Sequence, residues 1–105
     1  PLGKPSCGSV FRNPPNQHAA KLIDQCGLKG KRVGGAIVSE KHSNFIINTG
    51  NATSSDIKQL MELIQASVYE KYAIKLIPEV SFTFTVILLP VYMLSSSNIS
   101  IRSSE

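Results

Sequence analysis

The sequence predicts one α+β domain, in which a small sheet packs with two main helices. Two segments repeat apolar residues at helical spacing. Between them lie two short apolar runs, β-branched in part and bounded by turn formers, which are typical of strands. Hydrophobic residues make up 42% of the 105 residues and charged residues 17%, so the chain holds enough apolar material for one packed core.

The N-terminal part of the chain predicts a loop, one short strand and then the first helix. Residues 1–16 are rich in proline and glycine, with room for a strand over residues 7–12. The helix is expected over residues 18–26, with Asn16 as its N-cap and Gly27 as the left-handed residue that ends it. Its apolar face consists of Ala19, Leu22, Ile23 and Cys26.

The middle of the chain predicts two strands and a long helix. The strands are expected over residues 33–38 and 44–48, joined by a polar link. The helix is expected over residues 53–72, because Thr53 and Asp56 resemble a capping box. Its apolar stripe consists of Ile57, Leu60, Met61, Ile64, Val68 and Tyr72.

The C-terminal part changes character after the long helix. Residues 74–80 predict a strand that Pro78 interrupts, which favours an edge or a bend. Residues 82–94 have strong β character and are too short to cross a bilayer. Residues 95–105 are rich in serine and are expected to be disordered.

The net charge of +4 favours an anionic partner, such as nucleic acid, a membrane surface or a phosphorylated small molecule. No long run of lysine and arginine occurs, and no aromatic residues are interleaved with the basic ones, so we do not expect nucleic-acid binding. Cys7 and Cys26 have no disulfide-framework or metal-ligand spacing, which indicates reduced thiols in a cytosol-like compartment. No apolar signal-peptide core opens the chain.

The candidate ligand-binding residues lie around a glycine-rich stretch. Residues 30–35 match neither a dinucleotide fingerprint nor a P-loop, but the paired glycines allow close approach of another strand or of a ligand. The neighbouring basic residues form either a solvated face or a phosphate site. His42 alone is typical of a surface histidine, and Ser9 lies in no nucleophile elbow. These patterns indicate a basic domain with a candidate anion site and define no reaction.

Several motifs together resemble one enzyme family. Residues 6–14, S-C-G-S-V-F-R-N-P, resemble the G-S-x-F-[KR]-N-P motif of the UDP-N-acetylenolpyruvoylglucosamine reductases, or UDP-N-acetylmuramate dehydrogenases. Residues 39–46 resemble that family's S-E-K-H-x-N-F-I form. The resemblance extends from about residue 5 to residue 80 in family order, and its further blocks are residues 20–30, 34–36, 48–53 and 78–80.

The resemblance implies the C-terminal substrate-binding domain of a flavoenzyme of peptidoglycan precursor synthesis. The family reduces UDP-N-acetylglucosamine enolpyruvate with hydride from FAD, which NADPH reduces. Its proton donor falls on Ser9, and Glu79, with an arginine from elsewhere in the enzyme, stabilises the enediolate that develops. Asn13 falls at a substrate contact, and Lys29 and His42 fall beside the UDP diphosphate.

The same resemblance implies a domain over residues 1–81 and a divergent tail over residues 82–105 outside the family fold. FAD and NADPH would bind mainly to N-terminal domains that this chain lacks, so the isolated chain is expected to be an inactive monomer. A stand-alone nucleotide- or anion-binding module without catalysis is the alternative, and a membrane-associated protein using residues 82–94 is a third. We expect no membrane span, and location in the cytoplasm or, in a plastid-bearing host, the stroma.

Overall fold

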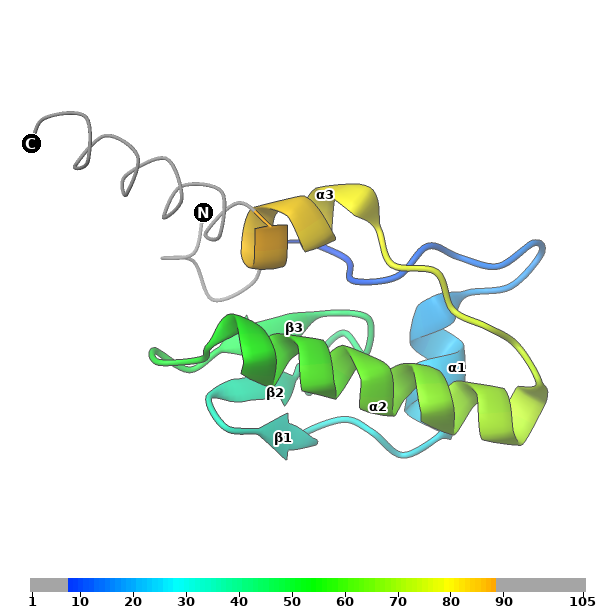
Figure 1. Cartoon of the computed structure of the whole chain (residues 1–105). Helices are drawn as coiled ribbons and strands as arrows, with labels where there is room; N and C mark the ends of the chain where they lie inside the picture. Colours follow the sequence, from blue (N-terminus) through cyan, green and yellow to red (C-terminus); the bar gives the residue numbers. More distant parts are fainter. Residues whose placement is uncertain (1–7, 89–105) are drawn as a thin grey trace, which may run out of the picture.

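The computed structural model describes residues 8–88 and has the predicted α+β architecture, so the fold class is confirmed (Figure 1). A three-stranded antiparallel sheet lies against the long helix α2, and α1 lies beside the C-terminal end of that helix. The elements are α1 (Ala19–Gln25), β1 (Arg32–Val33), β2 (Ala36–Val38), β3 (Ile46–Asn48), α2 (Ser54–Tyr72), α3 (Val80–Thr83) and the π-helical turn η1 (Phe84–Leu88).

The sheet has the order β1-β2-β3, and its first two strands form a tight hairpin. Val33 pairs with Ala36, so Gly34 and Gly35 are the only residues between the paired positions. The single strand predicted over residues 33–38 is therefore wrong. Gly34 has a φ of +54°, in the left-handed region, and this reverses the chain inside the apolar run.

The paired glycines lie against the N-terminal end of α2. The amide of Gly35 donates a 3.2 Å hydrogen bond to Oδ2 of Asp56. A methyl group at Gly35 would lie 2.6 Å from the backbone nitrogen of Ala52, closer than real side chains approach. The close neighbour of these glycines is therefore the start of a helix, where the sequence indicated either a strand or a ligand.

The predicted capping box at the start of α2 is confirmed. The hydroxyl of Thr53 accepts a 3.0 Å hydrogen bond from the Asp56 amide, and Oδ2 of Asp56 accepts a 3.1 Å bond from the Thr53 amide. The hydrogen bonds from the Thr53 and Gly35 amides lower the pKa of Asp56 below its ordinary value, because they favour the carboxylate. One carboxylate thus joins the helix start to the β1–β2 hairpin.

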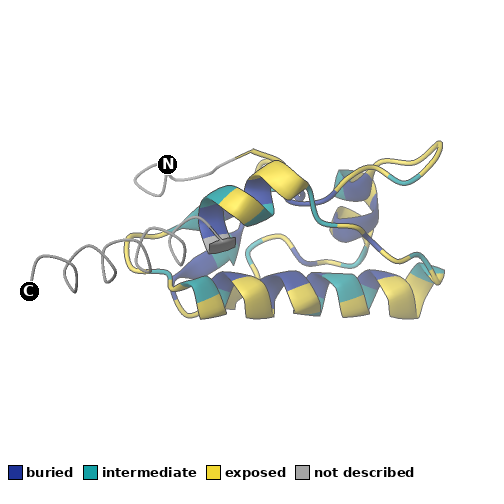
Figure 2. Ribbon diagram, turned by 45° about the horizontal axis from the view of Figure 1, so that its top comes forward, coloured by how far each residue is buried: buried dark blue, intermediate teal, exposed yellow. Residues whose placement is uncertain are grey.

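Helix α2 buries one face and exposes the other (Figure 2). Its apolar stripe is buried as predicted, apart from the half-buried Tyr72, whose hydroxyl bonds to the side-chain oxygen of Gln25 in α1 at 2.6 Å. The helix ends at Tyr72, and its C-cap residue Ala73 has a φ of +56°. The buried residues of the stripe are Ile57, Leu60, Met61, Ile64 and Val68.

The start of α1 differs from the prediction. His18 is the N-cap residue, whereas Asn16 lies outside the helix with a φ of +60°. The side chain of Asn13 does the capping instead, since its Oδ1 accepts a 2.9 Å hydrogen bond from the Ala19 amide. Asn16 as N-cap is therefore wrong. Gly27 does follow the helix in the left-handed region, with a φ of +71°, as predicted.

The strands predicted over residues 7–12 and 74–80 are reduced to one isolated bridge. Phe11 pairs with Pro78 in an antiparallel arrangement, and the residues around them are irregular. Proline has no N–H, so Pro78 can join such a bridge only as a non-hydrogen-bonded partner.

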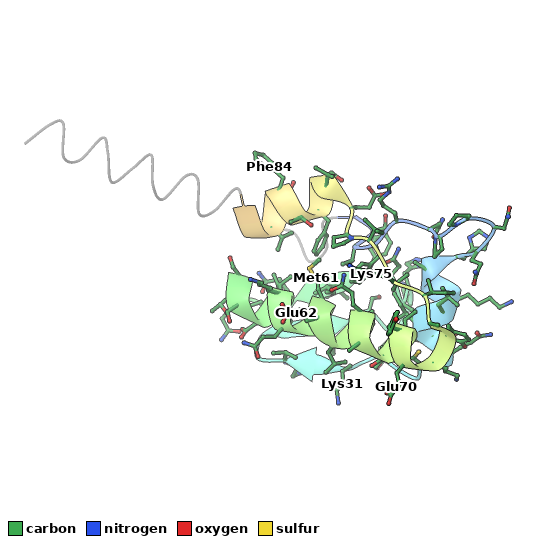
Figure 3. All side chains as sticks on the ribbon, turned by 45° about the vertical axis from the view of Figure 1, so that its right-hand side comes forward. Lys31, Met61, Glu62, Glu70, Lys75 and Phe84 are labelled. Carbon is green, nitrogen blue, oxygen red and sulfur yellow. The ribbon has the colours of Figure 1, made fainter. Side chains whose placement is uncertain are left out.

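Residues 80–88 are helical, which contradicts the β character predicted from residue 82 onward. Phe82 and Val86 are buried in the same core as the rest of the domain, whereas Phe84 points outward (Figure 3). Positions four apart share one helical face, so packing decides the conformation over strand propensity. The remainder of the tail, including the serine-rich residues 95–105, lies outside the described residues. The domain boundary after residue 81 stays a prediction.

Candidate functional site

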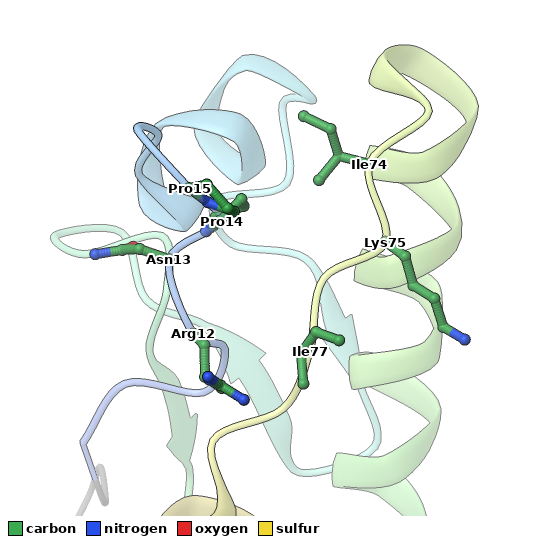
Figure 4. A pocket seen from close by; sticks show the side chains of 7 residues that line it. All are labelled: Arg12, Asn13, Pro14, Pro15, Ile74, Lys75 and Ile77. Atoms are coloured by element: carbon green, nitrogen blue, oxygen red, sulfur yellow. The ribbon is translucent and has the colours of Figure 1, made fainter.

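The segments that carry Ser9 and Glu79 run side by side although they lie far apart in the sequence. The Glu79 amide donates a 2.8 Å hydrogen bond to the Val10 carbonyl, and the Arg12 amide donates another of 2.8 Å to the Ile77 carbonyl. Figure 4 shows Arg12 and Ile77 on these neighbouring segments. Ser9 is exposed and Glu79 is half-buried. The structure therefore places the two residues predicted to be catalytic on neighbouring segments.

Pro78 fits this pairing because of its place in the hydrogen-bond pattern. The bonds on either side of the Phe11–Pro78 bridge come from the neighbouring residues, so the two bridged residues form a non-hydrogen-bonded pair. The missing N–H of Pro78 is not needed there. The N–H and C=O of Phe11 consequently point away from Pro78.

Asn44 holds the opposite edge of the same segment. Its backbone carbonyl accepts a 2.9 Å hydrogen bond from the Val10 amide. Its side chain accepts a 3.0 Å bond from the Phe11 amide and donates a 2.8 Å bond to the Phe11 carbonyl. The side chains of Val10 and Phe11 are both buried, with 1% exposure, and anchor the segment in the core. Val10, the residue after Ser9, is therefore held by backbone hydrogen bonds to Asn44 and Glu79 and by the burial of its side chain.

Asn13 borders a hollow of about 360 Å³ on this side of the domain (Figure 4). Its Oδ1 is engaged in capping α1, so its amide nitrogen is the group available to donate to a ligand. Two cations, Arg12 and Lys75, also border the hollow, and its remaining lining residues are apolar: Pro14, Pro15, Ile74 and Ile77.

Lys29 and His42 lie on two neighbouring loops. The amide of Gly30 donates a 2.9 Å hydrogen bond to the Val38 carbonyl, and a methyl group at Gly30 would lie 2.5 Å from Oε2 of Glu40. The Lys29 ammonium lies 3.7 Å from Oδ1 of Asp24. Glu40 of the His42 loop therefore lies beside Gly30, the residue after Lys29, whereas the Lys29 side chain is directed to Asp24 in α1.

The His42 loop has a defined shape and connects to the Ser9 segment. The hydroxyl of Ser39 accepts hydrogen bonds from the Lys41 and His42 amides at 3.1 and 3.2 Å. The exposed His42 ring lies 5.4 Å, centroid to centroid, from the ring of Phe45. Asn44, two residues after His42, then bonds to Phe11.

Asn44 is the residue that sequence reasoning missed. It appears in the S-E-K-H-x-N-F-I block without a role. The available signal was an asparagine beside an apolar strand, since a buried amide requires partners for both its donor and its acceptor. Its partner in the sequence could not be located from local patterns.

Comparison with known proteins decides the family. The model of the family described as "UDP-N-acetylenolpyruvoylglucosamine reductase, C-terminal domain" matches residues 1–83. The chain belongs to this family. The resemblance on which the sequence analysis relied is thereby confirmed, and the domain described above is a UDP-N-acetylenolpyruvoylglucosamine reductase C-terminal domain.

Named relatives agree with this assignment. The UDP-N-acetylenolpyruvoylglucosamine reductase of Alkalilimnicola ehrlichii is 59% identical over 80 residues, which are 76% of this chain and 27% of that protein. The reductase of Caldicellulosiruptor bescii is 57% identical over 82 residues, or 78% of this chain and 26% of that protein. The chain therefore spans about a quarter of the length of these relatives.

A solved structure supports the same conclusion at the level of the fold. The crystal structure of the UDP-N-acetylenolpyruvylglucosamine reductase from Thermus caldophilus aligns with a TM-score of 0.59 at 44% identity. The alignment covers 70% of this chain and 26% of the other. Across residues 8–88 of this reductase domain, no helix is long and apolar enough to cross a membrane.

Proposed function

We propose that this chain supplies the substrate-binding and proton-donating part of a UDP-N-acetylenolpyruvoylglucosamine reductase. The reaction is reduction of UDP-N-acetylglucosamine enolpyruvate to UDP-N-acetylmuramate, a step in peptidoglycan precursor synthesis. The observation that carries the proposal is the antiparallel pairing of the Ser9 and Glu79 segments through the Glu79–Val10 hydrogen bond. This backbone pairing supports the proposal because it makes neighbours of the two segments that would supply a proton and act on the developing charge.

Ser9 is proposed as the general acid. Hydride addition to the enolpyruvyl methylene carbon leaves an electron pair on the adjacent carbon, delocalised into the substrate carboxylate. The exposed Ser9 hydroxyl gives its proton to that carbon, and the resulting alkoxide is reprotonated from solvent. No base beside Ser9 is needed, because the residue donates a proton and does not attack a carbonyl.

Glu79 is proposed to act on the charge that develops during this step. Its side chain is half-buried, and its backbone is fixed by the hydrogen bond to Val10. Glu79 would act there together with an arginine from elsewhere in the enzyme, which would add positive charge beside the enediolate. Fixed groups of this kind stabilise a transition state without reorganising.

Asn13, Lys29 and His42 are proposed to bind the UDP-sugar. The ion pair of Lys29 with Asp24 spans 3.7 Å at the surface, so it is weak and can be exchanged for diphosphate oxygens. The neighbouring His42 loop supplies a second polar contact. The amide nitrogen of Asn13 supplies a third, close to the Ser9 segment.

FAD and NADPH are assigned to the part of the enzyme outside this chain. Reduced FAD supplies the hydride when it is bound. The glycine turn at Gly34 and Gly35 does not fit a cofactor phosphate, because Asp56 and Ala52 fill the space beside it. We propose that the complete enzyme lies in the cytoplasm, or in the stroma of a plastid.

A chimera tests the proposed function. Residues 1–83 replace the corresponding region of the complete Alkalilimnicola ehrlichii reductase. The chimera should retain bound flavin, be reduced by NADPH and be reoxidised by the enolpyruvyl substrate in stopped-flow traces. A chimera that binds flavin and accepts electrons from NADPH, yet is not reoxidised by that substrate, would overturn the proposal.

A further inference from the structure

We propose that Asn44 is a positioning residue for the Ser9 segment. Its side-chain amide takes the place of a neighbouring β-strand for Phe11, while its backbone carbonyl accepts from the Val10 amide, and together they hold the segment in register with Glu79. The inference rests on the proposed function for its catalytic consequence, because Ser9 must reach a defined carbon. Its structural basis is independent of that function and consists of three hydrogen bonds.

The hydrogen-bond pattern explains why such a group is needed. Phe11 faces Pro78 in a non-hydrogen-bonded pair, so its N–H and C=O point to the other side. Phe11 has only 1% exposure, and unpaired backbone groups at such a position are strongly unfavourable. Within residues 8–88, no strand lies along that side of Phe11, and Asn44 provides both partners there.

Asparagine is suited to this task by the shape of its amide. The side chain presents one acceptor and one donor side by side, as a peptide group of an adjacent strand would. Aspartate would keep the acceptor for the Phe11 amide but place a second acceptor against the Phe11 carbonyl. Leucine would supply neither group, and glutamine would displace both by one methylene.

The location of Asn44 gives this contact a wider effect. Asn44 is 6% exposed and follows the His42 loop, while the other edge of the Ser9 segment bonds to Glu79. A shift at Asn44 would therefore move the Ser9 hydroxyl relative to both the proposed diphosphate contacts and Glu79. Misplacing a reacting group by about 1 Å can lower a rate by about 10²-fold.

Amide hydrogen exchange in the 105-residue chain tests the positioning directly. In Asn44→Asp, the Arg12 and Glu79 amides should exchange about fivefold faster or more, the equivalent of losing one neutral hydrogen bond. The Leu60 amide, in the buried part of α2, reports on global stability and should change less. Parental exchange at Arg12 and Glu79 would overturn the inference, whatever the chimera does.

Asn48→Asp is the matched control, because it makes the same chemical change where the structure uses only the acceptor. Oδ1 of Asn48 accepts from the Gly50 and Ala52 amides at 2.8 and 3.0 Å. Arg12 and Glu79 should therefore keep their parental exchange in this variant. If Asn44→Asp fails to fold, Asn44→Gln keeps both groups on a longer stem and carries the same measurement.

Stopped-flow kinetics of the chimera then tests the catalytic consequence. In Asn44→Asp, flavin reduction by NADPH should be unchanged, and reoxidation by the enolpyruvyl substrate should slow roughly tenfold to 10²-fold with little change in KM. If Asn44→Asp is reoxidised at the parental rate while Ser9→Ala is reoxidised slowly, the positioning role of Asn44 is overturned and the proposed function stands. If the parental chimera is never reoxidised by substrate, the proposed function fails, and the exchange measurement still decides the positioning role.

Discussion

The backbone amide of Glu79 donates a 2.8 Å hydrogen bond to the carbonyl of Val10, the residue directly after Ser9. This bond joins two segments that are separated by nearly the whole length of the domain in sequence. It also makes neighbours of the segments that carry Ser9 and Glu79, which lie near opposite ends of the domain in sequence.

Ser9→Ala in the chimera should separate the two half-reactions. Flavin reduction by NADPH should stay near the parental rate, because it does not involve the enolpyruvyl carbon. Reoxidation by substrate should slow by about 10²–10⁴-fold, the typical contribution of a positioned general acid. Ser9→Cys should retain part of the rate, because a thiol can donate a proton from nearly the same position. A parental reoxidation rate in Ser9→Ala would make Ser9 a structural residue.

Lys29→Ala should weaken binding of UDP-N-acetylglucosamine to the chain about tenfold or more in titration calorimetry. A hydrogen bond to a charged group is typically worth about 1.5–3 kcal/mol. Asp24→Asn is the informative partner variant, because it removes the ion pair and leaves Lys29 free to meet the diphosphate. The affinity of Asp24→Asn for UDP-N-acetylglucosamine should equal or exceed that of the parent. Equal affinities for Lys29→Ala and the parent would remove Lys29 from the site.

Asp56 should make the stability of the domain dependent on acid pH. Its pKa is lowered from the ordinary value of 3.8, mainly by the Thr53 amide and then by the Gly35 amide. A lowered folded-state pKa stabilises the fold above the unfolded-state value, and this contribution is lost as the pH falls through the folded-state pKa. The difference in melting temperature between the parent and Asp56→Asn should therefore shrink below about pH 4. A difference that is constant from pH 7 to pH 2 would contradict this role.

Gly35→Ala should destabilise the domain by about 1–3 kcal/mol, the usual range for an overpacked site. The added methyl group would lie 2.6 Å from the Ala52 backbone nitrogen, so the hairpin and α2 would have to separate. Gly27→Ala is the comparison, since nothing lies within 4 Å of its added methyl and only its φ of +71° opposes the change. Chemical denaturation measures the free energy of unfolding of both variants. A Gly35→Ala variant as stable as the parent would rule out the close approach.

Phe82→Ala should destabilise the domain by about 3–5 kcal/mol, because the side chain has 1% exposure in the core. Phe84→Ala is the matched control on the same helical segment, with 48% exposure of the parental side chain. It should change the free energy of unfolding by about 0.5 kcal/mol or less. Equal effects of the two variants would show that residues 82–88 do not pack as described, and would favour the predicted boundary after residue 81.

Local signals were sufficient to predict α2 and the fold class. The Thr53–Asp56 capping box and the apolar stripe lie within the helix itself, so they could be identified without knowledge of other elements. The hairpin at Gly34–Gly35 was missed although a Gly-Gly pair between apolar residues is a hairpin signal. The helix over residues 80–83 could not be predicted from propensity, because its stability comes from the burial of Phe82 by the rest of the domain.

The candidate site depended more on family resemblance than on residue patterns. Ser9 and Glu79 were predicted from motif positions, and their pairing through Val10 is a contact that no local pattern encodes. The capping of α1 by Asn13 was missed because the side chain acts from six positions before Ala19, outside the usual cap. Asn44 was missed for the same reason at longer range, since its partner Phe11 lies 33 positions away.

The bridge between Phe11 and Pro78 also sets an order of assembly. Loop closure becomes less favourable as the separation in sequence grows, so contacts between distant segments form after local ones. The hairpin and α2 can form from neighbouring residues, whereas the Phe11–Pro78 bridge needs both ends of the domain. Residue 79 must therefore have emerged from the ribosome before the Ser9 segment can adopt its native conformation. The proposed proton donor is completed only when the chain that carries its partner has been made, which prevents a partly synthesised domain from presenting a finished site.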